Sequence, residues 1–507
     1  MSRAPLRDAV ARPEIYEGML AAEGDREAVK EVSEMEESVD EGQLCAMVIL
    51  VCLMLIYVIV GTRIETKGCG FGHETGAVIV IGMFISFLLS RINESSIGSF
   101  NPHVLFEFGL PMILYASGYN MRRRRFFDNI NNISMFGILS TVVCFVILSA
   151  LTWVVFNRDM VYKWSWDKET NQWEYTHFHA PHMELFLLCA MLCSSDIIAA
   201  VSLVKYRDYP RIFSVLLGEG LWNDAVAVVL AQSCERMVES KESISPSSIG
   251  RMVANFFLLS IVSTLIGVFF GLLTGLLTKH ARFLTRSSIH ETFTLILFGV
   301  LSYYIADLLK MSGIISIIVT AVMQAQYSWY NLSPQGKHVS AVTSQTLCYF
   351  AEALIFCYIG VGIFSYKKSD WSFNFIGYEL VIIIVGRLLS VLVVQYSFVL
   401  FGCENTFKFK ELVFLSYAGM IRGAIALGLA LKAFAVFSEY EVFVTSVLSL
   451  VIISTLVFGS FMPIVAKCLL DPPNKQKKEQ PKVELDQDNS DLQESLNEKL
   501  LSPSHSN

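Results

Sequence analysis

Residues 216–232 read LLGEGLWNDAVAVVLAQ, an apolar stretch that can lie within a bilayer and yet carries Glu219, Asn223 and Asp224. A charged side chain at the centre of a membrane costs about 2.5–3.5 kcal/mol on insertion scales, and it is usually retained where it binds or moves something. At about 100° per residue, Glu219 and Asn223 share a helix face and Asp224 points to one side. The stretch predicts a helix that aims Asp224 at a cavity and Glu219 at a structural partner. The alternative is a polar strip in which basic partners hold both acids.

The composition is that of a membrane protein. The chain has 507 residues, of which 53% are hydrophobic and only 17% charged, with a mean hydropathy of +0.51. Soluble chains carry about 25% charged residues. The net charge of -7 comes mostly from the terminal segments, so no nucleic-acid partner is expected. The eleven cysteines are scattered and show no metal-ligand spacing.

Apolar runs follow one another along most of the chain and are separated by short polar loops. Thirteen lie at 44–61, 75–91, 101–119, 131–156, 183–204, 212–233, 252–278, 287–308, 312–328, 340–365, 374–402, 411–436 and 441–467. They predict an all-α polytopic membrane protein with about 13 transmembrane helices. We expect an acidic disordered segment at 1–43, a membrane domain at 44–467 and a short disordered tail at 468–507.

The basic residues of the short loops indicate the orientation. Four consecutive arginines, Arg122 to Arg125, follow the third run, and Lys205, Arg207 and Arg211 follow the fifth. With thirteen spans, these loops share one side with the lysine-bearing C-terminal tail. The positive-inside rule assigns that side to the cytoplasm and the N-terminus to the outside or lumen.

The fifth run also carries polar residues, since Ser194, Ser195 and Asp196 lie at its middle. Hydroxyl and carboxylate oxygens together suit a hard cation such as Na⁺. In the alternative interpretation, the serines bond to their own helix and Asp196 pairs with a neighbour.

Three further charges lie in the last runs: Glu352 in the tenth, Arg387 in the eleventh and Arg422 in the twelfth. Gly419 and Gly423 flank Arg422 and indicate an interrupted helix. The free ends of such a helix need a charge partner or line a cavity, and Arg422 can neutralise one of them. We expect Glu219 and Arg387 to form a structural ion pair.

Several other polar residues receive no transport role. Asp307 is expected at the membrane interface, and Glu107 in the third run has no assigned role. His177, His179 and His182 are interpreted as solvated loop residues, because no cysteine or spaced acid completes a metal site.

The motifs resemble those of the sodium/proton exchanger family, in the branch of cation/proton antiporters with an Asn-Asp pair. The resemblance covers about residues 75–467, in the family's order. Its most specific motif is LLGEGLWNDAVAVVL. The others are FNPHVLFEFGLPMILYASGYNMRRRRFFDNI, SSDIIAAVSL, AEALIFCYIGVGIF and YAGMIRGAIALGLAL. The elements GEG and AGxxRGA lean toward vacuolar and endosomal exchangers.

The resemblance implies an inverted-repeat fold with core and dimerisation domains, in which the fifth and twelfth spans are broken and cross. It implies a homodimer with an elevator-like motion. Its implied cation ligands are Asp196, Asn223 and Asp224, with Na⁺ at Asp224 and Asp196. Glu219 and Arg387 would be the stabilising pair and Arg422 the charge at the crossing.

Some residues depart from the family pattern. Asp196 is followed by Ile197 where proline is frequent, and Trp222 stands where the family has a small aliphatic residue. Met112 follows Pro111 in place of a second proline. Met112, together with Glu107 before it, leaves the response to amiloride-type inhibitors open.

The expected function is electroneutral exchange of Na⁺ for H⁺, because one carboxylate holds either a cation or a proton and Asn223 adds no second acid. Exchange of K⁺ and a conducting cation channel remain as alternatives. The membrane would be the plasma membrane or an endosomal or vacuolar membrane, with lipids and a second copy as partners. Neither a cofactor nor an enzymatic activity is expected, since the sequence shows no nucleophile–base pair.

Overall fold

The computed structural model describes residues 47–63, 74–92, 102–121, 129–167, 172–197, 200–201, 204, 209–240, 246–363, 369–400, 407–433 and 436–470. The predicted segment 1–43 and the tail beyond residue 470 lie outside the described residues. So do the side chain of Glu107 and the arginines from Arg122 to Arg125.

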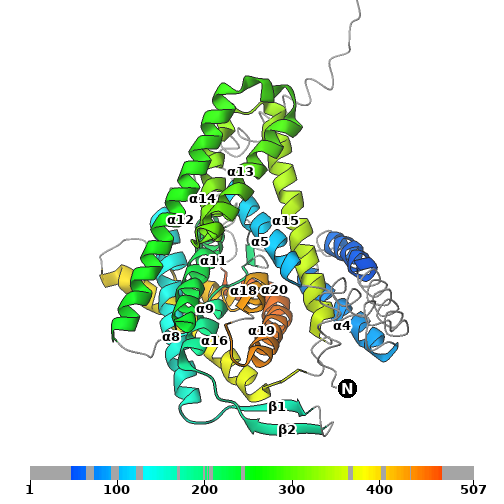
Figure 1. Ribbon diagram of the computed structural model, residues 1–507, viewed down its shortest axis with the longest axis vertical. Coiled ribbons are helices and arrows are strands. Elements are labelled where there is room, and N and C mark those ends of the chain that lie inside the picture. Colours follow the sequence, from blue (N-terminus) through cyan, green and yellow to red (C-terminus); the bar gives the residue numbers. More distant parts are fainter. Residues whose placement is uncertain are drawn as a thin grey trace, which may run out of the picture.

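Helices occupy all thirteen of the predicted apolar runs in the described part of the chain (Figure 1). They are Met47–Arg63, α4 (Glu74–Ile92), α5 (Pro102–Tyr119), α7 (Ile130–Ser134), η1 (Met135–Leu139), α8 (Ser140–Phe156), α9 (His182–Leu192), α11 (Pro210–Glu239), α12 (Pro246–His280), η2 (Arg282–Arg286), α13 (Ser288–Leu308), α14 (Gly313–Gln326), η3 (Ser328–Asn331), α15 (Pro334–Gly362), α16 (Phe373–Leu400), α17 (Phe409–Ala418), α18 (Ala424–Lys432), α19 (Tyr440–Ser454), η6 (Thr455–Gly459) and α20 (Ser460–Leu469).

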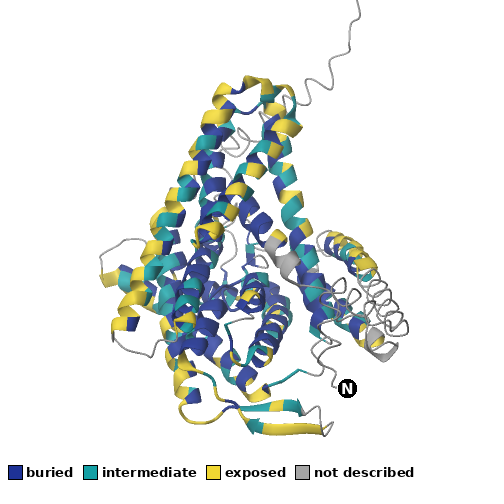
Figure 2. Cartoon of the chain, in the orientation of Figure 1, coloured by how far each residue is buried: buried dark blue, intermediate teal, exposed yellow. Residues whose placement is uncertain are grey.

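Seven continuous helical stretches of the described chain are long and apolar enough to cross a membrane, including Ile130–Phe156 and Tyr440–Leu469. Their exposed faces are also apolar. On α12, Phe257, Ile261, Leu265 and Phe269 are each more than half exposed, and Figure 2 shows exposed residues recurring along this helix. An apolar face this large is typical of a surface that contacts lipid. The predicted polytopic membrane fold is confirmed.

The helices pack in two groups. In what we call the scaffold group, α12 packs on α13 and α14, and α15 packs on α4 and α5. In the crossing group, α9 packs on α8, α11 and α18, while α16 packs on α8, α17 and α19. The two groups meet where α11 contacts α12 and α18 contacts α5. Within the crossing group, an interrupted helix lies between two long ones twice, at residues 130–239 and 373–469.

A β-hairpin interrupts the otherwise helical chain in the loop between α8 and α9. Strand β1 (Tyr162–Asp167) pairs antiparallel with β2 (Gln172–His177), and alternating aromatic residues favour strands here. The Tyr162 ring stacks on Tyr175, with centroids 5.0 Å apart, and lies 4.3 Å from the ring of His177. The hairpin was not predicted from the sequence, although the alternation of aromatic and polar residues in 162–177 is a signal that could have identified it.

The hairpin is attached to the loops that precede α16 and α19. Backbone hydrogen bonds of 2.7 and 2.9 Å join Trp164 to Trp371. The Lys163 ammonium lies 3.2 Å from Asp370 and 2.7 Å from Glu439. Burial acts to lower the pKa of Lys163, but the hydrogen bonds and charges of Glu439 and Asp370 outweigh it and raise the pKa above its ordinary value of 10.5. The ammonium therefore stays charged and ties three loops together.

Replacing Lys163 by Met should lower the unfolding temperature in detergent, because the change removes its ion pairs with Asp370 and Glu439, together worth about 1 kcal/mol. Lys163→Arg, which keeps the charge, is the control and should unfold near the wild-type temperature. Since the folded-state pKa is raised, the contribution of Lys163 is full below 10.5 and fades as pH rises through that raised pKa. Equal unfolding temperatures for Lys163→Met and wild type would contradict this role.

Candidate functional site

Two interrupted helices meet at the centre of the crossing group. Helix α9 ends at Leu192, and the chain is not helical from 194 to 197. Helix α17 ends at Ala418 and α18 begins at Ala424, which leaves a second non-helical stretch. The Asp196 N–H donates to the Ile421 carbonyl at 2.9 Å, so the two stretches are in direct contact. The break predicted from the glycines beside Arg422 is present.

Arg422 neutralises the end of α9. Its side chain is fully buried, and Nη1 donates to the carbonyls of Cys193 (3.3 Å) and Ser194 (3.0 Å). These carbonyls follow the last turn of α9, where the helix dipole is negative. The Arg422 N–H also donates to Ser454 Oγ at 3.0 Å, so the residue is held from α19 as well.

Asp196 lies at the N-terminal end of a helix, whereas Arg422 lies at a C-terminal end. A Cβ added to Gly423, which directly precedes α18, would lie 3.0 Å from Asp196 Oδ2 and 2.7 Å from its Cβ. The carboxylate is therefore next to the positive N-terminal end of α18, a favourable place for an anion. Only a residue without a side chain permits this close approach.

Asp224 faces the first non-helical stretch from α11. Ser194 Oγ donates to Asp224 Oδ1 at 2.6 Å. Because Asp196 is two residues further along the same stretch, the structure brings both predicted carboxylates to the crossing. Ser194 was noted in the sequence but not selected as a site residue, and the structure adds it.

The Asn223 amide is buried beside Asp224 and contacts Ser195 and Thr141. Thr141 donates its hydroxyl proton to the Gly137 carbonyl at 2.6 Å, so it can only accept from Asn223. In that orientation the Asn223 nitrogen donates to Thr141 (2.9 Å) and to the Cys193 carbonyl (3.0 Å), and its oxygen accepts from the Ser195 N–H (3.1 Å). Asn223 thus positions the non-helical stretch, and no signal in the sequence linked Thr141 to it.

Glu219 and Arg387 form the predicted ion pair between α11 and α16, and both side chains are buried. Ser140 lies beside the pair, 3.5 Å from Arg387 Nη1 and 3.2 Å from Ser390 Oγ. A Cβ at Gly419 would overlap the Arg387 guanidinium, so the second non-helical stretch packs directly on this pair.

Two further acids on the long apolar helices have different surroundings. Glu352 lies on α15 of the scaffold group, where the Cys348 thiol donates to it at 3.3 Å. Glu379, which the sequence analysis passed over, is fully buried on α16 and accepts from Thr152 Oγ1 at 2.6 Å. Its position in an apolar run was the signal that could have identified it.

The crossing is chemically suited to one hard cation or one proton. Its available donors are the carboxylates of Asp224 and Asp196 and the hydroxyls of Ser194 and Ser195. Oxygen donors of this kind are the ligands that Na⁺ and other hard cations prefer. The guanidinium of Arg422 donates to backbone carbonyls, and the Asp224 carboxylate accepts from Ser194.

Replacing Gly423 by Ala should push Asp196 away from the N-terminus of α18, since the new methyl group would lie 2.7 Å from the Asp196 Cβ. Overpacking of this kind costs about 1–3 kcal/mol. We expect a lower unfolding temperature and a weaker stabilisation by added Na⁺. Gly377→Ala, at a position with open space within 4 Å, is the matched control. Unchanged Na⁺-dependent stabilisation in Gly423→Ala would show that Na⁺ binding does not require the close approach of Asp196 to the N-terminus of α18.

Replacing Glu219 by Gln should destabilise the fold by about 3–5 kcal/mol, because it leaves the buried Arg387 charge without a partner. The double variant Glu219→Leu with Arg387→Met removes both charges and should recover most of that loss. Unfolding temperatures of Glu219→Leu, Arg387→Met and the double variant measure the coupling. Additive losses would show that the pair is not coupled.

Comparisons with known proteins identify the family. Residues 37–468 match the family model described as sodium/hydrogen exchanger, transmembrane. Sodium/hydrogen exchanger 3 of Arabidopsis thaliana is 25% identical over 454 residues, covering 86% of each chain. Sodium/hydrogen exchanger 8 of Homo sapiens is 23% identical over 430 residues, covering 83% of this chain and 70% of that protein.

The fold is similar to that of a solved antiporter. The sodium proton antiporter MjNhaP1 of Methanocaldococcus jannaschii aligns with a TM-score of 0.61 at 15% identity, over 84% of this chain and 99% of that one. The family match spans the interrupted helices, the Asn223–Asp224 pair and the buried ion pair alike. The chain therefore belongs to the sodium/hydrogen exchanger family of membrane transporters.

Proposed function

We propose that this protein exchanges Na⁺ for H⁺ across a membrane by alternating access, with Asp224 as the residue that carries either ion. The observation that supports this most directly is the Asp224 carboxylate held by Ser194 at the contact of two interrupted helices. The relatives named as sodium/hydrogen exchangers support the choice of ions.

Competition at one carboxylate couples the two ions. Asp224 can hold a cation or a proton but not both, so one ion must be released before the other binds. Moving an ionised Asp224 without a partner through a region that excludes water would cost a large amount of free energy. The empty site therefore stays on its own side, and the loaded site crosses.

The neutral amide of Asn223 sets the stoichiometry in this proposal. With no second acid at that position, one Na⁺ exchanges for one H⁺ and no net charge moves. A membrane potential is worth about 2.3 kcal/mol per charge per 100 mV, so it should not drive the cycle. A tenfold Na⁺ gradient, about 1.4 kcal/mol, should instead sustain about one pH unit.

The buried charges that do not titrate in the cycle hold the site in place. Arg422 stabilises the interrupted end of α9, and the Glu219–Arg387 pair fixes α11 against α16. We assign these three residues structural roles. We assign Glu352 a supporting role within the scaffold group, where its helix packs on α4 and α5.

The cellular setting is part of the proposal. We infer a homodimer in the plasma membrane or in an endosomal or vacuolar membrane, with the C-terminal tail in the cytoplasm and residues 44–467 as the transport domain. There it would control the pH and cation content of the cell or organelle. The exchange would need no cofactor, and K⁺ is the alternative substrate.

Replacing Asp224 by Asn should abolish Na⁺-driven proton flux in proteoliposomes, because the amide can neither ionise nor take up a proton. The variant should still assemble and unfold near the wild-type temperature, which size-exclusion chromatography and thermal unfolding would verify. Residual Na⁺-dependent proton flux in this variant would contradict the assignment of Asp224 as the residue that carries the ions. K⁺ assayed in parallel identifies the preferred cation.

The same proteoliposomes, held at several membrane voltages, test the stoichiometry. Wild-type flux should ignore voltage, whereas Asn223→Asp, which adds a second acid, should make any remaining flux voltage-dependent. Wild-type flux that follows voltage would mean that another acid carries a second proton. A current that reverses at the cation's Nernst potential without proton movement would identify a channel.

A further inference from the structure

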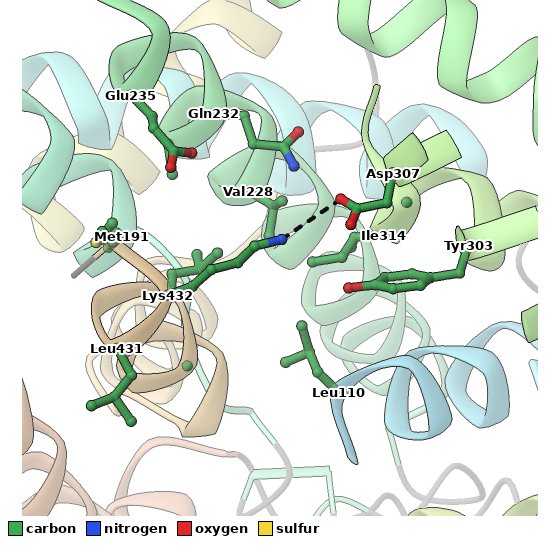
Figure 3. A pocket seen from close by; sticks show the side chains of 15 residues that line it. Leu110, Met191, Val228, Gln232, Glu235, Tyr303, Asp307, Ile314, Leu431 and Lys432 are labelled. Atoms are coloured by element: carbon green, nitrogen blue, oxygen red, sulfur yellow. Dashed lines mark ion pairs between the residues drawn. The ribbon is translucent and has the colours of Figure 1, made fainter. Parts of the chain in front are cut away.

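A cavity between the two helix groups opens beside the crossing (Figure 3). The crossing group contributes Val228, Gln232 and Glu235 from α11 and Lys432 from α18. The scaffold group contributes Tyr303 and Asp307 from α13. In the elevator-like motion that the family resemblance implies, one group moves against the other, and this cavity would lie at the boundary between them.

One wall of the cavity continues toward Asp224. Val228 and Glu235 are four and eleven residues after Asp224, and at about 100° per residue all three lie on one face of α11. With a rise of about 1.5 Å per residue, Glu235 is about 16 Å along the helix from Asp224. Met191, which also lines the cavity, is three residues before Ser194. The cavity is therefore placed as an entrance to the site.

The entrance already holds a cation of the protein's own. Lys432 Nζ lies 3.7 Å from Asp307 Oδ1, and the two side chains are 52% and 47% exposed. Figure 3 shows the Lys432 side chain extended toward Asp307, with Gln232 and Glu235 of α11 above the lysine side chain in this view. The ion pair joins α18 of the crossing group to α13 of the scaffold group.

We propose that Lys432 acts as a tethered competitor of the transported cation at this entrance. Its ammonium group occupies the place at Asp307 and Glu235 where an incoming hydrated cation would otherwise pause. Lys432 thereby weakens the apparent cation affinity from this side and limits loading to high cation concentrations. This inference rests on the proposed function, whose substrate it takes as the incoming ion.

The charges around Lys432 fix the sign of the effect. Asp307 and Glu235 line the cavity with Lys432, so the three groups together carry one negative charge. Without Lys432 the same walls carry two, and a cation arriving from water meets a stronger attraction. Because Lys432 and Asp307 are half exposed, water and salt screen their charges, and an exposed pair changes binding by about threefold.

The test is the Michaelis constant for Na⁺, measured with Na⁺ added on each side of oriented proteoliposomes. Lys432→Gln should lower that constant about threefold from the entrance side and leave the maximal rate and the opposite side unchanged. Asp307→Asn and Glu235→Gln should raise it. Lys279→Gln, an exposed lysine at the end of α12, is the matched control and should change neither side.

The opposite changes in the Michaelis constant distinguish competition with the cation from a purely structural role of the ion pair. If the ion pair only held the two helix groups together, Lys432→Gln and Asp307→Asn would shift the kinetics in the same direction, and the proposal would be overturned. An unchanged constant in Lys432→Gln, with Lys432→Met as a second variant, would also overturn it.

Measuring Na⁺ binding tests the role of Lys432 independently of the proposed transport function. The Na⁺ concentration that gives half-maximal thermal stabilisation in detergent should fall in Lys432→Gln and rise in Asp307→Asn, whether or not proton flux accompanies binding. Absent Na⁺-driven proton flux in wild type would overturn the proposed function alone. Identical half-maximal concentrations in all variants would overturn the role of Lys432.

Discussion

The site depends on one interaction, the hydrogen bonds from the Arg422 guanidinium to the carbonyls of Cys193 and Ser194. An interrupted helix leaves backbone carbonyls without partners, and each unsatisfied group costs several kcal/mol inside a bilayer. Arg422 supplies both the donors and the positive charge for the end of α9. Because these carbonyls are satisfied, the stretch after α9 can stay open and present Ser194 to Asp224.

Close packing then decides where each charge lies. Gly423 admits the Asp196 carboxylate to the N-terminus of α18, and Gly419 admits the Arg387 guanidinium to the other side of the same stretch. Opposite charges thus approach one short segment from two directions. A larger residue at either glycine would separate the carboxylate from the helix end or the ion pair from the crossing.

Three residues of α11 have different roles because their side chains point in different directions. Glu219 pairs with Arg387, Asn223 contacts the first non-helical stretch, and Asp224 faces Ser194. The same helix extends from Asp224 to Glu235 at the entrance. One element therefore connects the fixed ion pair, the carboxylate that binds the ion and the cavity through which the ion arrives.

The sequence by itself determined the class of protein, the thirteen helical runs and the charged residues of the site, since hydropathy and polar residues within apolar runs are local properties. It also indicated the break beside Arg422, because glycine weakens a helix in any fold. Only the tertiary structure decided that Thr141 positions Asn223, that Glu379 is buried against Thr152, and that a hairpin joins the loops before α16 and α19. The physical reason is distance along the chain. Helical periodicity predicts the face on which a residue lies, but its partner, often more than two hundred residues away, is set by how the helices pack.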